Sequence, residues 1–246
     1  MSGAGRSSIR PARSDDAGFI ARVVLAAQRG PVPRGWFDIA LDRPEGECLA
    51  FMTRLAVARA RSWYHVAHFL IAEVDGVPAA ALCAMPASGT VVAARAAIEE
   101  VAAETGMDAD AIVARGGYAR NCWVQGGEGD WLIEHVARQA SQHSRGLVQE
   151  LIGRALADGK AAGFARASIS FLIGNDAAER CYTKAGFAFA EEKRDAAFEA
   201  LTGAPGFRRF ARAIWVGAAN APHIQAVVVD GVVRLCPMVL SSRRRP

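Results

Sequence analysis

Apolar residues between positions 147 and 156 recur with the period of an α-helix. They stand at i, i+1, i+4, i+5, i+8 and i+9, namely Leu147, Val148, Leu151, Ile152, Ala155 and Leu156. This spacing puts them on one face of a helix. Gly163 is a residue type suited to the left-handed conformation that ends many helices. The pattern therefore predicts an amphipathic helix that stops near residue 163.

Strand-like runs lie on both sides of this helix. "WLIEHVAR" (131–138) precedes it and "FARASISF" (164–171) follows it. The order strand, loop, helix, strand predicts a βαβ unit. In such a unit the free N–H groups at the helix N-terminus, and the positive end of the helix dipole, lie at the carboxyl edge of the sheet. A phosphate group could bind there, but an ordinary βα turn has the same pattern.

The first part of the chain predicts one strand and two helices. A short strand around Ile9 is followed by a helix over 15–30, for which we expect Ser14 to be the N-cap. Pro and Gly are dense in residues 30–47, which predicts a loop that contains one helical turn. A second helix is expected over 48–61.

The strongest two-residue turn signal in the chain is Asp75-Gly76, which predicts a β-hairpin over 68–85. Charged residues and Pro78 interrupt this apolar run, so it does not predict a membrane span. Beyond the hairpin and the βαβ unit, the pattern predicts helices over 91–105 and 108–115, a loop over 116–130, a short helix that ends at Gly186, strands over 187–194 and 207–216, and a last hairpin over 224–240.

Composition limits the classes of function. The chain has 246 residues, of which 52% are hydrophobic, enough for a full core in one large domain or two small ones. The net charge is +4, drawn partly from arginines near both ends. Basic ends alone are weak evidence for a nucleic-acid partner, so that function is disfavoured.

The cysteines and histidines point to a reduced protein without a metal. The five cysteines are odd in number and widely spaced, and none forms a CxxC pair, which is typical of a cytoplasmic protein. No apolar segment follows the basic N-terminus, so we expect no secretory signal. His65 and His68 have a spacing that could hold a metal, but no carboxylate or thiol joins them nearby. We predict no metal site and no association with membranes.

Three runs occur in a characteristic order: "IEHVAR" (133–138), "HSRGLV" (143–148) and "NDAAERCYTKAGF" (175–187). Together they resemble the GNAT superfamily of acyl-CoA-dependent N-acetyltransferases. That family has an EHV-type run on a strand, a Q/R-x-x-G-x-G/A turn at a helix N-terminus and an N-x-x-A-x-x-x-Y-x-x-x-G-F run. Here Gly146 is retained, His143 stands where Gln or Arg is usual, and Val148 replaces the final Gly or Ala.

The resemblance implies an α/β (α+β) fold with a mixed, mostly antiparallel twisted sheet, a central βαβ unit and flanking helices. Its order of elements covers roughly residues 9–194, and the likeness of residues is concentrated in 131–194. We expect an acetyltransferase domain over 1–213 with a helical insertion at about 88–122. Residues 214–246 are expected to be a C-terminal extension, with a β-hairpin and a basic tail.

The resemblance also implies acetyl-CoA as cosubstrate. The strand would offer backbone groups to the pantetheine arm, the turn would hold the pyrophosphate, and an asparagine would hold the cofactor or the end of the opened strand. The residues expected to bind it are Val136, Ala137, His143, Ser144, Arg145, Gly146, Leu147, Val148 and Asn175. An equally good interpretation of Asn175 is a helix N-cap, and the two roles are compatible.

Two residues are candidates for the chemistry. An amine with a pKa near ~10.4 must lose a proton before it attacks, and the resemblance implies that Glu134 accepts it. A thiolate then leaves, and Tyr182 can donate a hydrogen bond to it. The alternatives are a Glu134 paired with an arginine and a Tyr182 that only packs beside Phe187. Strand alternation places Glu134 and His135 on opposite faces.

The main hypothesis is an N-acetyltransferase that moves the acetyl group of acetyl-CoA to a primary amine by direct attack in a ternary complex. Cys181 adjoins Tyr182, but neighbouring residues on a helix point apart, which disfavours a covalent route. The alternative, which the altered phosphate turn suggests, is a non-catalytic relative that binds CoA or a partner protein. The acceptor amine cannot be read from the sequence, and a homodimer stays open. A cleft beside Trp36, Trp63 and Trp123 is where we expect the acceptor.

Overall fold

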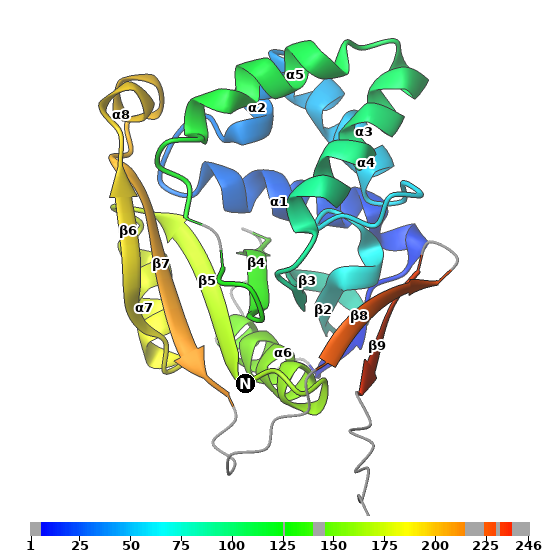
Figure 1. Cartoon of the computed structure of the whole chain (residues 1–246), viewed down its shortest axis with the longest axis vertical. Coiled ribbons are helices and arrows are strands. Elements are labelled where there is room, and N and C mark those ends of the chain that lie inside the picture. Colours follow the sequence, from blue (N-terminus) through cyan, green and yellow to red (C-terminus); the bar gives the residue numbers. More distant parts are fainter. Residues whose placement is uncertain (1–5, 125, 140–145, 215–223, 230–231, 238–246) are drawn as a thin grey trace, which may run out of the picture.

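A seven-stranded sheet forms the centre of the computed structural model, which describes residues 6–124, 126–139, 146–214, 224–229 and 232–237 (Figure 1). The strand order is β1-β2-β3-β4-β5-β7-β6. The strands are β1 (Ser7–Pro11), β2 (Phe69–Val74), β3 (Val77–Pro86), β4 (Trp131–Arg138), β5 (Arg166–Leu172), β6 (Ala188–Arg194) and β7 (Gly206–Ala213). All neighbours are antiparallel except β4 and β5, which are parallel and joined by α6 (Leu147–Ala161). The expected mixed sheet with a central βαβ unit is confirmed.

Helices cover both faces of this sheet. In Figure 1 five helices, α1 to α5, lie above the sheet in the view and α6 lies toward the bottom. The five are α1 (Ala17–Arg29), α2 (Trp36–Leu41), α3 (Glu45–Leu55), α4 (Thr90–Thr105) and α5 (Ala109–Gly116). Alternate residues of β2 and β3 serve the two layers: Ile71 and Cys83 pack with α1 to α5, whereas Leu70 and Leu82 pack with α6.

Short sequence signals, such as turn and helix-end residues, predicted most of these elements correctly. At the hairpin turn Asp75 and Gly76 both have positive φ, 51° and 79°, as the tight turn between β2 and β3 requires. Gly163 has φ of 87° just after α6. The helix predicted within 175–187 is α7 (Asp176–Lys184). Between β3 and β4 the chain forms α4, α5 and the short 3-10 helix η3 (Gly117–Ala119). These helices lie where the sequence predicted helical segments.

The start of α1 differs from the prediction. Ser14 is not its N-cap, because residues Ser14–Asp16 form a 3-10 turn, η1, and α1 begins at Ala17. The Asp16 carboxylate accepts a hydrogen bond from the Arg13 N–H at 2.7 Å and pairs with Arg10 at 2.7 Å. This buried carboxylate fixes the entry of the chain into the helix, so Ser14 has no capping role.

Two further helices differ from the sequence prediction. The helix predicted over 48–61 is α3, which begins at Glu45 and ends at Leu55. A short helix that the pattern did not predict, α8 (Ala196–Thr202), connects β6 to β7. The helical turn expected within 30–47 is α2. The strands β8 (Ile224–Val229) and β9 (Val232–Pro237) pair with each other in a separate two-stranded sheet, where the sequence predicted a last hairpin.

Candidate active site

The parallel strands β4 and β5 pair at one end and separate toward the other. Within the described residues their ladder covers three pairs: Trp131–Ala167, Leu132–Ser168 and Ile133–Ile169. Beyond Ile133, β4 continues its ladder with β3, and β5 continues its ladder with β7. A cavity of about 700 Å³ borders both strands where they separate. Because buried backbone groups need hydrogen-bond partners, the freed edge of β4 suits a ligand that contains amides.

A β-bulge in β4 lies beside this opening. Glu134 faces Cys83 and Ala137 faces Ala81, so three steps along β4 match two along β3. His135 lies within the bulge and has φ of 51°, in the left-handed region. Both Glu134 and His135 line the cavity. Glu134 faces Cys83 of the helical layer, and His135 stacks on Tyr64 of the same layer. The prediction that Glu134 and His135 lie on opposite faces was therefore wrong, because the bulge breaks the two-residue period of the strand.

Glu134 is a half-buried carboxyl group on β4 that lines the cavity. It makes no ion pair with any described residue, so the alternative of a carboxylate held by an arginine is not observed. Burial raises its pKa to about 8, because loss of water disfavours the charged form. This side chain is therefore poised to exchange a proton slightly above neutral pH.

Tyr182 reaches the same cavity from α7. Its side chain is buried at 6% exposure, and its ring meets the edge of Phe171 at 5.4 Å between centroids. No described residue makes a hydrogen bond with its hydroxyl group. Burial, and then the charges of Cys181 and Glu134, raise the pKa of the phenol. The hydroxyl therefore stays protonated and can donate a hydrogen bond to a ligand.

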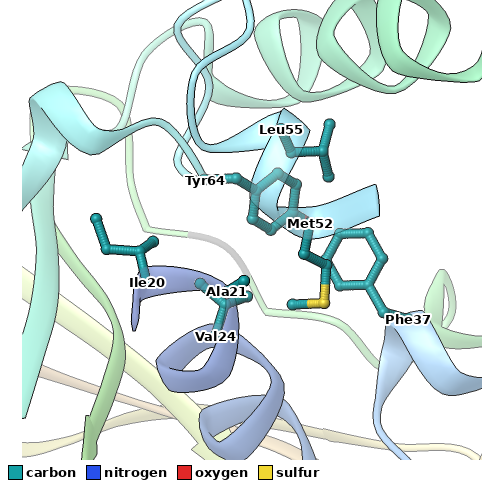
Figure 2. A pocket seen from close by; sticks show the side chains of 7 residues that line it. All are labelled: Ile20, Ala21, Val24, Phe37, Met52, Leu55 and Tyr64. Carbon is teal, nitrogen blue, oxygen red and sulfur yellow. The ribbon is translucent and has the colours of Figure 1, made fainter. Parts of the chain in front are cut away.

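The helical core fixes the wall beside the bulge. Figure 2 shows Tyr64 among side chains of α1, α2 and α3, which pack together with essentially no open volume. The Tyr64 ring contacts Phe37 at 5.1 Å and stacks on His135 at 5.4 Å between centroids. Burial lowers the pKa of His135 to about 3, so its imidazole is neutral at physiological pH. A rigid aromatic stack thus holds the bulge in place.

The residues expected to hold the cofactor lie at the end of β4 and the start of α6. Val136, Ala137 and Val148 line the cavity. Gly146 precedes α6 with φ of 101°, a conformation that favours glycine. The Leu147 side chain is buried in the core beneath α6, which leaves its backbone at the helix N-terminus. Three predicted residues lie outside the part of the chain that the structure describes: His143, Ser144 and Arg145.

Asn175 caps α7. Its Oδ1 accepts a hydrogen bond from the Ala178 N–H at 3.1 Å, which is the helix-cap alternative considered for this residue. Asn175 also lines the cavity, so the cap leaves its amide group within reach of a ligand. The two roles are compatible in this geometry.

Comparison with known proteins addresses the fold. No protein-family model matches the chain, and no curated protein is similar to it in sequence. Among solved structures, one acetyltransferase is 17% identical and covers 85% of this chain and 100% of its own length, with a TM-score of 0.63. An N-acetyltransferase from Staphylococcus aureus Mu50 is 19% identical and covers 83% of this chain and 100% of its own, with a TM-score of 0.56. A GNAT-family structure from Desulfovibrio desulfuricans is 15% identical and covers 85% and 100%, with a TM-score of 0.50. The chain has the GNAT fold.

Aromatic residues from helices, strands and loops of this GNAT fold line the cavity. Trp36, Trp63 and Trp123 line the cavity, as expected. Further lining rings come from Tyr64, Tyr118, Phe171, Phe198 and Phe207. They lie on different elements, so only the tertiary fold brings them together.

In residues 6–124, 126–139 and 146–214 and the two C-terminal strands, no three His, Cys, Asp or Glu residues are arranged to hold a metal ion. Across the same ranges, no helix is both long and apolar enough to span a membrane.

Proposed function

We propose that this protein transfers the acetyl group of acetyl-CoA to a primary amine by direct attack in a ternary complex. The observation that carries the proposal is that Glu134 and Tyr182 border the same cavity, at the place where β4 and β5 separate. In direct transfer the amine must lose a proton, and the departing thiolate must be stabilised. Glu134 can accept the proton, and Tyr182 can donate a hydrogen bond to the thiolate.

The cofactor side of the cavity has the features that an acyl-CoA needs. The pantetheine arm carries amides, and the edge of β4 beyond Ile133 has backbone groups that β5 does not pair. The α6 N-terminus begins at Gly146 and favours anions such as a pyrophosphate. Arg138, which lines the cavity at the end of β4, adds a positive charge on this side. These features support binding of acetyl-CoA along β4 toward α6.

Glu134 is the proposed general base. An alkylammonium has a pKa near ~10.4, so most of the acceptor is protonated at neutral pH and must lose a proton before it attacks the thioester. A carboxyl group whose pKa is about 8 matches this task better than one with an ordinary value of 4.5. Glu134 takes the proton directly or through a water molecule.

Tyr182 is the proposed hydrogen-bond donor to the sulfur. A thiol titrates near ~8.5 and an ordinary phenol near ~10, and burial raises the phenol pKa of Tyr182 further. Full proton transfer from Tyr182 to the thiolate is therefore uphill. A hydrogen bond from its hydroxyl stabilises the negative charge that develops on sulfur in the transition state.

No covalent acyl-enzyme is needed. Cys181 lines the cavity, but burial raises the pKa of its thiol, which reduces the thiolate available for attack. Gln149 donates hydrogen bonds to the Cys181 carbonyl oxygen at 2.8 Å and to its Sγ at 3.2 Å. These contacts give Cys181 a structural role between α6 and α7.

The test is amine-dependent release of the CoA thiol from acetyl-CoA. Purified protein is mixed with acetyl-CoA and a panel of small amines and peptide N-termini, and thiol release is followed against a reaction without amine. Acceleration by at least one amine, with a matching acetylated product, supports the proposal. A protein that binds acetyl-CoA but acetylates nothing on a broad panel supports the non-catalytic alternative, in which Val148 belongs to an altered phosphate turn.

A further inference from the structure

The cavity has an unusual charge composition. Of the described residues that line the cavity, Glu134 is the only acid, whereas four arginines line it: Arg34, Arg95, Arg120 and Arg138. Burial keeps the Glu134 carboxyl group largely protonated at neutral pH. An acceptor with several positive charges would meet no fixed negative charge in the cavity, and it would be repelled by the arginines.

Two of these arginines already have partners in the chain. Arg34 donates a hydrogen bond to the Asp38 carbonyl oxygen at 3.0 Å and lies 3.6 Å from the Asp42 carboxylate. Arg95 pairs with Glu99 at 2.6 Å and with Asp110 at 2.7 Å. Their charges are therefore compensated within the protein.

Arg120 differs from this pair. It follows η3 and lines the cavity with an exposed side chain. It forms no ion pair with any residue in the described part of the chain. A guanidinium group presents paired donors that match the two oxygens of a carboxylate. Arg120 is thus the cation of the acceptor side that has capacity for an anionic group of a ligand.

Aromatic rings make the rest of this wall. The Trp63 and Trp123 rings meet edge to face at 5.4 Å, and the Tyr118 ring stacks on Phe198 at 5.5 Å between centroids. All four residues line the cavity. Such rings favour a flat apolar group, which gains both burial and ring contacts. The wall and Arg120 together therefore match a ligand with a ring and an anionic group.

We propose, on the basis of the proposed function, that the acceptor is an amine with an aromatic body and a carboxylate, the chemistry of an aromatic amino acid. The amine lies toward Glu134, the ring lies against the wall of Trp63, Tyr118 and Trp123, and the carboxylate pairs with Arg120. This excludes polyamines as the preferred acceptors. It also distinguishes tryptophan and phenylalanine from tryptamine and phenethylamine, which have the same rings and lack the carboxylate.

The test compares phenylalanine, tryptophan, phenethylamine, tryptamine and spermidine as acceptors, with kcat and KM taken from thiol release. Binding of phenylalanine is measured separately by calorimetry in the presence of CoA. We expect the amino acids to have kcat/KM at least about tenfold above the decarboxylated amines and spermidine to be the poorest acceptor. In Arg120→Gln the KM for phenylalanine should rise roughly tenfold, which corresponds to ~1.4 kcal/mol, while the KM for phenethylamine stays within about twofold.

Arg22→Gln is the matched control, because Arg22 is exposed on α1 and does not line the cavity. It should leave all five acceptors unchanged. Equal use of phenylalanine and phenethylamine, an Arg120→Gln variant with wild-type selectivity, or spermidine as the best acceptor would each overturn this inference while acetyl transfer itself stands. Phenylalanine that binds through Arg120 without any acetylation would contradict the proposed function instead.

Discussion

Glu134 on β4 and Tyr182 on α7 border one cavity, and the pKa of the Tyr182 phenol is raised first by burial and then by the charges of Cys181 and Glu134. The two groups therefore belong to one electrostatic site, although they come from separate elements. A base and a hydrogen-bond donor around one opening are what direct transfer from a thioester to an amine requires.

The pH dependence of the reaction should report the Glu134 carboxyl group. Its raised pKa, about 8, means that the base form is scarce below that pH and abundant above it. We expect kcat/KM of the wild type to rise with pH up to about 8. Glu134→Gln should lower the rate roughly 10² to 10⁴-fold, with the largest defect between pH ~8 and ~10. The defect should shrink as pH approaches the amine's own pKa of ~10.4, where the acceptor is already neutral.

The exposed residue Glu128 provides the control for this experiment, because it does not line the cavity. Glu128→Gln should keep the wild-type profile. A Glu134→Gln variant with a wild-type rate at pH 8.5 would remove the general-base assignment.

The same carboxyl group should affect stability. In the unfolded chain it loses its proton near the ordinary value of 4.5, whereas in the folded protein it keeps the proton until about pH 8. The folded state thus binds more protons between these values, so this residue lowers the free energy of unfolding as pH rises through that window. Glu134→Gln should be more stable than the wild type by a few kcal/mol at pH 9 and about equally stable near pH 4. Melting temperatures of both proteins across this range give the measurement, and a difference independent of pH would contradict the raised pKa.

Removing the Tyr182 hydroxyl should slow the chemical step without weakening the binding of acetyl-CoA. The Tyr182 ring packs against Phe171, and Phe at position 182 keeps that contact. We expect Tyr182→Phe to reduce kcat roughly 10² to 10⁴-fold, to leave the affinity for acetyl-CoA little changed and to leave the shape of the pH profile unchanged. A wild-type kcat in this variant would show that Tyr182 has a packing role only.

The sequence was informative where one element carries its own signal. The apolar face of α6, the left-handed Gly163 and the Asp75-Gly76 turn each depend on residues close together in the chain, and each is present in the structure. In contrast, α8 has only seven residues, two of which are buried, so it shows too little periodicity to be recognised. Its capping residue Asp195, whose carboxylate accepts from the Phe198 N–H at 2.8 Å, was the available signal.

The geometry of the site could not be predicted in this way. The bulge at His135 is set by the registers of β3 and β4, which depend on both strands at once. The opening of the sheet depends in turn on β4 and β5 pairing over only three residues, while each strand stays paired with its other neighbour. The resemblance named Glu134 and Tyr182 one at a time, and only the fold brings them to one cavity.

Residues after Ile214 should be dispensable for cofactor binding. The strands β8 and β9 pair only with each other among the described strands, whereas the Ile214 N–H donates to the Ala165 carbonyl oxygen at 2.9 Å and Ile214 packs on the core. A chain that ends at Ile214 should fold and bind acetyl-CoA with an affinity within about threefold of the full chain. Circular dichroism and calorimetry test this, and a truncated chain that fails to fold would place the C-terminal hairpin in the core structure.

Binding of acetyl-CoA tests the central claim most directly. A ligand at 100 times its dissociation constant stabilises the fold by ~2.7 kcal/mol, which for a chain of this size is a rise in melting temperature of roughly 5 to 10 °C. We predict such a rise for acetyl-CoA and for CoA, and none for adenosine alone, which lacks the pantetheine arm that we propose pairs with β4. A melting temperature that stays constant up to millimolar acetyl-CoA would contradict the account.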